Sequence, residues 1–270
     1  MSEKDEREAL LARLAALDLS ALRRLSTLAA AGPDNATDSG QSYLDFLTGV
    51  SQSDIGFLKE AEKSYGNSWK LRGGVDTFHM LRRKWERIES TVAQDIKPAA
   101  SSPGANPYDI FEHITADRRA DGFIDDVRDL RRYLMLVEAE MTVRREQALP
   151  DSGRRYLDQL AAIAAGDVAV IAEKEKSYGN AWKRAGGIGA FMMFARKWDR
   201  IQQRVVTRIE PAEGAPGAAR DNVLDHIVAD RRTEGVMADI RDLRQYLLLV
   251  EAEMIARGVV AAAMQGDDPA

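Results

Sequence analysis

The sequence predicts an all-α protein built from two tandem copies of one helical unit of about 110 residues. Three observations predict this class. The motif KSYGN occurs at 63–67 and again at 176–180, and the same shift of 113 residues aligns the rest of the two copies without a gap. Apolar side chains recur at steps of three and four residues in both copies, and no segment shows the strict alternation of a β-strand. We expect the copies to pair as a pseudo-two-fold helical bundle.

An additional helix is expected before the first copy. Leucines lie near helical spacing in residues 1–31, and glycine, proline, asparagine and aspartate residues follow them as a linker. The helix and linker therefore take up residues 1–37, unit 1 spans 38–150 and unit 2 spans 151–263. The short tail at 264–270 is expected to be disordered.

Each unit is expected to begin with two short helices, at 42–50 and 53–63 in unit 1 and at 154–164 and 167–176 in unit 2. Two longer helices follow, and each carries one apolar stripe that we expect to form core. The stripes of unit 1 are Phe78, Leu81, Trp85, Ile88 and Val92, then Val127, Leu130, Leu134, Val137 and Met141. Those of unit 2 are Phe191, Phe194, Trp198, Ile201 and Val205, then Ile240, Leu243, Leu247, Val250 and Met254. Loops rich in small residues, 99–107 and 212–220, separate the two longer helices.

Composition excludes several classes of function. The net charge of −5 provides no global basic field, so the sequence carries no strong nucleic-acid signal. The absence of cysteine excludes disulfides, zinc–thiolate sites and thiol nucleophiles. Acidic residues near the N-terminus argue against a signal peptide, and no apolar run approaches the ~18 residues that span a bilayer. We therefore expect a cytoplasmic protein without membrane contact.

The last helix of each unit carries acids beside its apolar stripe. Asp126, Asp129, Tyr133, Leu136 and Glu140 lie close together at helical spacing, and unit 2 repeats them as Asp239, Asp242, Tyr246, Leu249 and Glu253. Carboxylates beside a buried stripe need a cation, and oxygen-only ligands suit Mg²⁺ or Mn²⁺. The alternative is a salt-bridged face without a ligand, because arginines are abundant nearby: Arg118, Arg119, Arg128 and Arg131, with copies at Arg231, Arg232, Arg241 and Arg244.

A second candidate site is the turn Tyr65-Gly66-Asn67-x-Trp69-Lys70-x-x-Gly73-Gly74, copied at 178–187. Glycines let a backbone approach a ligand, and the helix that begins after them offers free N–H groups to phosphate. Trp69 is a candidate for stacking on a base, with Lys70, Arg83 and Lys84 adding charge. The alternative is a structural turn whose tryptophan fills the core. His113 and His226 are expected to be hydrogen-bonding residues on a helix surface or between helices.

The motif order resembles that of the nucleotide-modification-associated domain found largely in phage proteins, which is distantly similar to the all-α, MazG-like nucleoside triphosphate pyrophosphohydrolases. The matching residues are Lys63, Tyr65, Gly66, Ser68, Trp69, Lys84, Arg87, Asp121, Asp125, Asp129, Leu130 and Tyr133, and in unit 2 Lys176, Tyr178, Gly179, Trp182, Lys197, Arg200, Glu234, Asp242, Leu243 and Tyr246. The resemblance implies a nucleotide ligand, Mg²⁺ held by carboxylates from two helices, and paired units, which the duplication supplies within one chain as a pseudo-dimer. Two departures are Ala238 in place of an aspartate, and a first helix with Glu60 and Glu62 instead of E-x-x-E.

Two hypotheses of function follow. The first is a nucleotide-binding or nucleotide-processing protein of phage type, with Mg²⁺-dependent phosphohydrolysis as its enzymatic form. The second is a non-catalytic helical interaction module that binds a protein partner or sequesters a small signalling nucleotide. The predicted ligand-binding residues are Trp69, Lys70, Arg83, Lys84, Trp182, Lys183, Arg196 and Lys197. The predicted metal ligands are Glu60, Asp125, Asp126, Asp129, Glu173, Asp239 and Asp242.

Overall fold

The computed structural model describes residues 43–119, 122–145 and 153–261. Within these ranges the chain is all-helical, with eight α-helices, two short 3-10 turns and only isolated β-bridges in the loops, so the predicted all-α class is confirmed. The predicted N-terminal helix, its linker and the tail lie outside the described residues.

The two units contain the same elements in the same order. Unit 1 holds α3 (Tyr43–Tyr65), η1 (Ser68–Lys70), α4 (Gly74–Val92), α5 (Ile110–Ala116) and α6 (Phe123–Arg145). Unit 2 holds α7 (Gly153–Tyr178), η2 (Ala181–Lys183), α8 (Gly186–Val205), α9 (Val223–Ala229) and α10 (Val236–Ala256).

The first helix of each unit is continuous, so the prediction of two short helices at 42–50 and 53–63, and at 154–164 and 167–176, is wrong. The polar residues that suggested a break face inward instead of ending the helix. Asp54 in α3 is 1% exposed and Asp167 in α7 is 5% exposed, because each is the partner of a buried arginine. A buried ion pair therefore interrupts the apolar pattern without interrupting the backbone.

Two short helices were not expected from the sequence. Asp109 caps α5 by accepting hydrogen bonds from the N–H groups of Phe111 and Glu112, each at 3.1 Å. Asn222 caps α9 by accepting one from Asp225 at 3.2 Å. Both caps follow the predicted loops, so an Asp or Asn before an apolar residue was the available signal.

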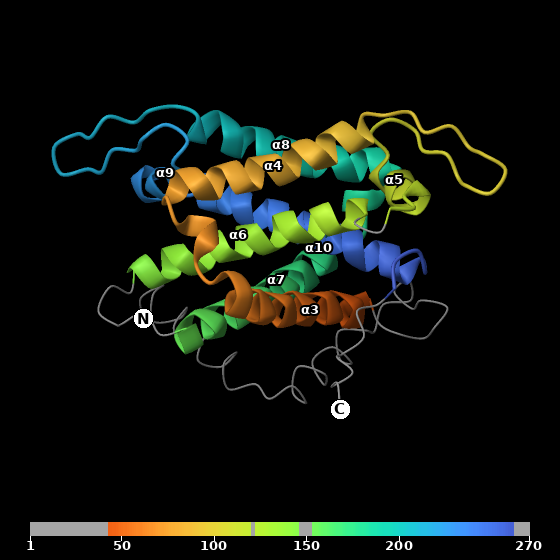
Figure 1. The fold of residues 1–270 in the computed structure, drawn as a ribbon, viewed down its shortest axis with the longest axis horizontal. Coiled ribbons are helices and arrows are strands. Elements are labelled where there is room, and N and C mark those ends of the chain that lie inside the picture. Colours follow the sequence, from red (N-terminus) through yellow and green to blue (C-terminus); the bar gives the residue numbers. More distant parts are fainter. Residues whose placement is uncertain (1–42, 120–121, 146–152, 262–270) are drawn as a thin grey trace.

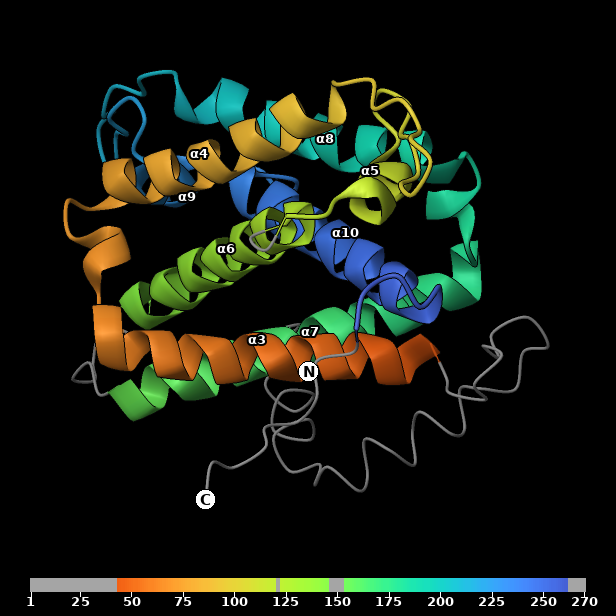
Figure 2. The ribbon, with the colours of Figure 1, turned by 45° about the vertical axis from the view of Figure 1, so that its right-hand side comes forward.

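The helices form three layers, each containing one pair of equivalent helices (Figures 1 and 2). The helices α4 and α8 make the upper layer in Figure 1, α6 and α10 the middle layer, and α3 and α7 the lower layer. The loops that follow α4 and α8 project from opposite ends of the upper layer. The middle layer is therefore covered on both faces, which places the helices with the predicted acids at the centre of the molecule.

The four predicted apolar stripes are buried and belong to one core that both units share. Trp85 of α4 stacks on Trp198 of α8, with 5.5 Å between ring centroids, and also on Phe191 at 5.9 Å. Phe78 stacks on Trp198 at 6.1 Å. Because the largest aromatic side chains of each unit pack on those of the other, neither unit completes its own core.

Helix packing crosses between the units in a reciprocal way. The helix α3 of unit 1 packs on α10 of unit 2, and α7 of unit 2 packs on α6 of unit 1. Likewise α5 packs on α8, and α9 packs on α4. Reciprocal contacts of this kind are those of an isologous interface between two like subunits. Among the described residues, no helix is both long enough and apolar enough to span a membrane.

Candidate functional site

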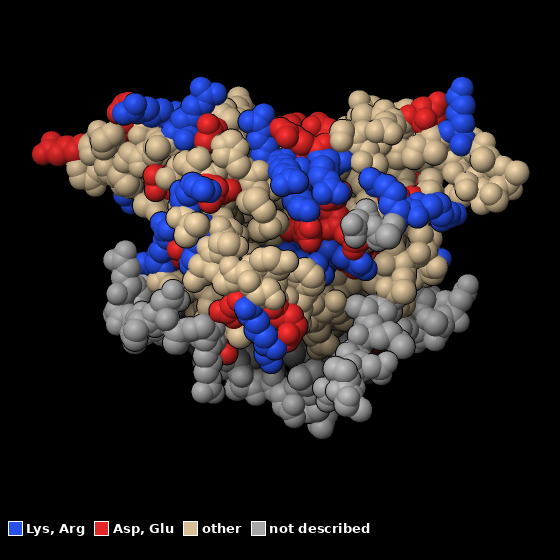
Figure 3. Space-filling model, in the orientation of Figure 1, with Lys and Arg blue, Asp and Glu red and all other residues tan. Residues whose placement is uncertain are grey.

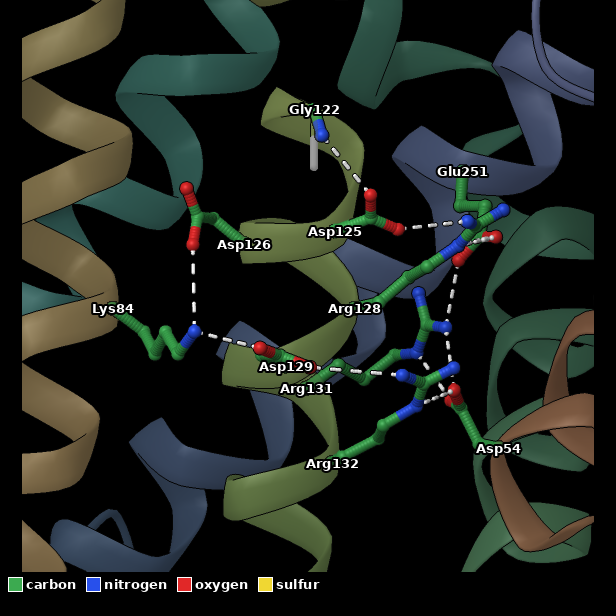
Figure 4. Close-up of polar contacts among 10 residues, drawn as sticks. All are labelled: Asp54, Lys84, Gly122, Asp125, Asp126, Arg128, Asp129, Arg131, Arg132 and Glu251. Carbon is green, nitrogen blue, oxygen red and sulfur yellow. Dashed lines mark hydrogen bonds and ion pairs between the residues drawn. The ribbon is translucent and has the colours of Figure 1, made fainter. Parts of the chain in front are cut away.

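Two aspartates of α6 face α4 and share one lysine. The Nζ atom of Lys84 lies 2.6 Å from Asp129 and 3.5 Å from Asp126 (Figure 4). The Nε atom of Arg87 lies 3.1 Å from the other oxygen of Asp126. Asp126 is 2% exposed, so these two cations supply the partners that a buried carboxylate requires.

Unit 2 repeats this arrangement with more cations. The Nζ atom of Lys197 lies 2.7 Å from Asp242 and 3.7 Å from Asp239. Asp239 is 1% exposed and also pairs with Arg200 at 3.2 Å and Arg204 at 2.7 Å. The salt-bridged alternative therefore describes these acids, but most of their partners come from the preceding long helix, α4 or α8, and the others are Arg132 of α6 and Lys174 of α7.

One predicted arginine in each unit remains unpaired beside these clusters. Arg83 and Arg196 are exposed, and neither makes an ion pair or hydrogen bond with a described residue. Each lies four residues before an arginine that binds the buried aspartate, Arg87 or Arg200, and therefore shares a helix face with it. Figure 3 shows basic and acidic side chains gathered over the middle of α4 and α6.

The predicted metal ligands do not gather in one place. Glu60 pairs with Lys63 at 2.8 Å on the exposed end of α3, and Glu173 pairs with Lys176 at 2.7 Å on α7. Asp125 points to the opposite side of α6 from Asp126 (Figure 4). Among the described residues, no group of three or more His, Cys, Asp or Glu side chains is placed to hold a metal ion. Magnesium binding stays a prediction.

Asp125 instead holds the side chain of Arg128 in place. It accepts hydrogen bonds from the N–H of Gly122 and from Arg128, each at 3.1 Å. Arg128 also binds Glu251 of α10 at 2.6 Å. In unit 2, where Ala238 replaces the aspartate, Arg241 keeps the equivalent bond to Glu138 at 2.6 Å. Ala238 therefore removes one of the two partners of an arginine.

The predicted turn is present, and its tryptophan and lysine pack into the fold. Gly66 and Gly179 adopt positive φ values of 50° and 51°. Trp69 is 8% exposed within the core, which corresponds to the structural alternative. Lys70 binds Glu140 at 2.5 Å. In unit 2, Trp182 packs edge-on against Phe111, and Lys183 binds Glu253 at 2.5 Å.

The second glycine of each Gly-Gly pair contacts the other unit. A Cβ atom added to Gly74 would lie 1.9 Å from the side-chain oxygen of Asn222, the residue that caps α9. One added to Gly187 would lie 1.8 Å from the side-chain oxygen of Asp109, which caps α5. The close backbone approach that the glycines suggested is therefore an approach between units.

The two histidines are buried, at 1% exposure each, and bond to loop carbonyl groups. Nε2 of His113 lies 3.1 Å from the carbonyl oxygen of Asn106. Nε2 of His226 lies 2.8 Å from that of Thr207, and its Nδ1 lies 2.9 Å from that of Asn222. The histidines therefore make hydrogen bonds, but to carbonyl groups of loops and of a helix cap and not between two helices, and the helix-surface alternative is wrong.

A buried ion-pair network that the sequence analysis missed joins the units. Arg131, 2% exposed, binds Asp54 of α3 at 2.5 Å and Glu251 of α10 at 2.7 Å (Figure 4). In unit 2, Arg244 binds Asp167 of α7 and, at 2.7 Å, Glu138 of α6. Burial of Glu251 alone would raise its carboxyl pKa, but Arg131 and Arg128 outweigh burial and lower that pKa. The available signal was that Asp54 and Asp167 are identical in the two copies.

The units differ beside this network. In unit 1, Arg132 binds Asp54 at 2.9 Å and lies over the ring of Phe57. In unit 2 the equivalent residue is Gln245, which donates to Asp167 at 3.2 Å. Gln245 also accepts from Lys174, which stands where unit 1 has Ala61. The positive charge has therefore moved from the last helix to the first.

Lys174 also connects the buried network to the aspartates of α10. Its Nζ atom lies 3.2 Å from Asp242. Burial alone would raise the pKa of the Asp242 carboxyl, but the hydrogen bond from Lys197 and the charge of Lys174 outweigh burial and lower it. Asp242 is therefore held as a carboxylate by two lysines.

No protein-family model, curated protein or solved structure matches the chain. The resemblance to the nucleotide-modification-associated domain and to MazG-like enzymes therefore depends on the motif residues alone and stays a prediction.

Proposed function

We propose that the protein binds a phosphorylated ligand of the nucleotide class through lysine and arginine side chains, without hydrolysing it. The site is the basic face of unit 2, which we define as Lys174, Arg196, Lys197, Arg200 and Arg204 together with Asp239 and Asp242. The observation that carries the proposal is the surplus of charge: four cations pair with two carboxylates, and the exposed Arg196 lies one helical turn before Arg200. The equivalent face of unit 1 has four cations beside Asp126 and Asp129: Lys84, Arg87 and Arg132 pair with these acids, and Arg83 lies one turn before Arg87.

The buried carboxylates support phosphate binding by holding the cations in place. Arg200 and Arg204 are anchored on Asp239, and Lys197 is anchored on both acids, so less side-chain entropy is lost when an anion binds. Arg196 adds a guanidinium group that is free to form two parallel hydrogen bonds to a phosphoryl group. We therefore expect unit 2 to bind more tightly than unit 1.

The same ion pairs oppose catalysis through a bound metal. To hold Mg²⁺, Asp239 and Asp242 would have to leave cations that lie within 4 Å of them. Each such pair makes metal binding less favourable because a carboxylate must lose one partner to gain the other. We therefore expect the ligand to bind in the presence of EDTA and to remain intact.

A calorimetric panel of nucleoside mono-, di- and triphosphates, with Mg²⁺ and with EDTA, tests the proposal. Arg196→Gln should lower the affinity by about tenfold, since one charge-assisted interaction is lost. Arg208→Gln is the matched control, because Arg208 is an exposed arginine that pairs with Glu210 on the loop after α8. Binding that requires Mg²⁺, turnover of the nucleotide, or an unchanged affinity in Arg196→Gln would contradict the proposal.

One observation favours the interaction module as a second candidate. Ile188, Met192 and Met193 of α8 are 44%, 46% and 39% exposed, and exposed methionines are common on adaptable protein-binding surfaces. Unit 1 has Val75, His79 and Met80 at these positions. A partner that binds the wild type and Asp242→Ala but not Met192→Glu would favour this second function over the first.

A further inference from the structure

A cavity of about 450 Å³ lies on the other side of α6 from Lys84, and the basic faces do not include it. It is lined by the first turns of α6, the chain after α5, Ser53 of α3 and the segment after α10. Its volume is within the range of small-molecule sites in proteins. Apolar atoms of Ile124 and Val260 form part of its wall.

Three arginines line this cavity, and carboxylates hold each of them. Arg119 binds Asp117 through Nε and Nη2 at 2.9 and 2.8 Å. Arg128 binds Glu251 through Nε and Asp125 through Nη1, and Arg132 binds Asp54 through Nε. Nη1 of Arg119 and Nη2 of both Arg128 and Arg132 make no hydrogen bond to a described residue. Three anchored guanidinium groups thus retain donors for an anion.

A second observation is the difference between the copies at this position. Unit 2 has Gln245 for Arg132, Ala238 for Asp125 and Gly166 for Ser53. The buried carboxylate of unit 2 is nonetheless satisfied, since Asp167 is bound by Arg244 and by Gln245. Unit 2 meets the need for charge at this point with Lys174, which binds Gln245, whereas Arg132 places a guanidinium group on the cavity wall of unit 1.

We propose that this cavity of unit 1 binds the phosphoryl group of a small molecule, with Arg119, Arg128 and Arg132 as its ligands. The planar guanidinium groups suit the oxygens of a phosphoryl group, and the apolar wall suits an organic substituent on it. Asp125 competes with the anion for Arg128. Unit 2 has Gln245 in place of Arg132, so we expect the three-arginine site in unit 1, independently of any nucleotide on the basic faces.

Titration of the full chain with inorganic phosphate and with phenyl phosphate, followed by calorimetry in low-chloride buffer, tests this site. Arg132→Gln, which installs the residue of unit 2, should weaken binding at least about tenfold. Asp125→Ala, which installs the other residue of unit 2, should strengthen it severalfold, because a competing negative charge is removed. Tighter binding of phenyl phosphate would identify the ligand as an organic phosphate, and equal binding would identify it as phosphate itself.

Arg119→Gln and Arg232→Gln form a matched pair for this experiment. Each arginine binds an aspartate two residues before it through Nε and Nη2, but Arg232 is in unit 2, outside the cavity. Binding should fall in Arg119→Gln and stay unchanged in Arg232→Gln. Wild-type protein that binds neither probe at millimolar concentration, or Arg132→Gln that binds like the wild type in a folded chain, would overturn the proposal.

Discussion

At the scale of single residues, the buried arginines Arg131 and Arg244 have the strongest structural demands. Each guanidinium group lies between a carboxylate on the first helix of its own unit, α3 or α7, and a carboxylate of the opposite unit. Burial of a charged group is costly unless each charge has a partner of opposite sign. Here two carboxylates surround the buried arginine, and a second arginine, Arg128 or Arg241, binds one of these carboxylates. Removal of Arg131 leaves Asp54 with Arg132 and Glu251 with Arg128, and each carboxylate loses its most deeply buried partner.

We therefore expect Arg131→Met to lower the free energy of unfolding by about 3–5 kcal/mol, because Asp54 loses its buried partner and Glu251 keeps only Arg128. Urea denaturation followed by circular dichroism measures this change. Arg132→Gln serves as the control, with a loss of about 1 kcal/mol or less, since glutamine occupies that position in unit 2. Equal losses in the two variants would show that the network does not depend on Arg131.

Asp117 makes the stability of the fold depend on pH in the acidic range. Burial acts to raise the pKa of the Asp117 carboxyl, but hydrogen bonds from Arg119 and from the N–H of Phe123 outweigh burial and lower that pKa from 3.8 to about 2. A pKa that is lower in the folded state means that the carboxylate stabilises the fold above about pH 4. That contribution is lost as the pH falls from about 4 to about 2.

Asp117→Asn should consequently lower stability by on the order of 2 kcal/mol at neutral pH and by much less near pH 2. Chemical denaturation of both proteins over this pH range provides the comparison. If the difference in stability between wild type and variant were the same at both ends of the range, the hydrogen-bonded carboxylate would not be the cause.

At the scale of elements, the start of each long helix is fixed by contact with the other unit. Gly73 and Gly186 adopt positive φ values of 74° and 66°. The next residue, Gly74 or Gly187, then approaches the cap of a short helix in the other unit too closely for a Cβ atom. One glycine of each pair is thus required by backbone conformation and the other by space.

Gly74→Ala should destabilise the protein by about 1–3 kcal/mol, because Asn222 and the backbone of Leu224 would have to move. Gly56→Ala is the control: Gly56 is exposed within α3, nothing lies within 4 Å of its added Cβ, and alanine should stabilise the helix by about 1 kcal/mol. Midpoints of urea unfolding measure both changes. Opposite signs are expected, and a neutral Gly74→Ala would mean that the caps can shift freely.

Periodicity predicted the long helices and their buried stripes because those helices obey the 3.6-residue rule along their whole length. It failed for α3 and α7, where an inward aspartate looks like a surface residue in the pattern. It also gave no partner for the acids of α6: Asp126 and Asp129 were grouped correctly, but Lys84 and Arg87 come from another helix. Ion pairs between helices depend on which helices pack together, and the periodicity of a single helix does not give that information.

At the scale of the whole molecule, both units contribute to a single core and a single set of ion pairs. The stacked aromatic residues of α4 and α8 and the crossed packing of α3 on α10 and α7 on α6 leave no interface that could open without exposing core. Sequence comparison between the copies predicted that the units would pair, but not that each would supply helices to the other. A repeat boundary marks a duplication and need not mark a domain.

Unit 2 alone, expressed as residues 151–263, should therefore not form a folded monomer. It would expose Phe194 and Trp198, which are fully buried in the whole chain, and leave Arg244 without Glu138. Size-exclusion chromatography with near-ultraviolet circular dichroism should show self-association or loss of tertiary structure, and mixing with unit 1 should restore the native signal. A monomer with a native spectrum would show that the units are independent domains.

The exchange of Arg132 and Ala61 in one unit for Gln245 and Lys174 in the other has a consequence for the origin of the chain. A homodimer of a single unit must carry every substitution twice, so it cannot keep an arginine-lined cavity on one side and a lysine on the other. When the two copies are parts of one polypeptide, each copy can lose a residue that the other copy keeps. Fusion thus permits a division of labour that symmetry forbids to a dimer.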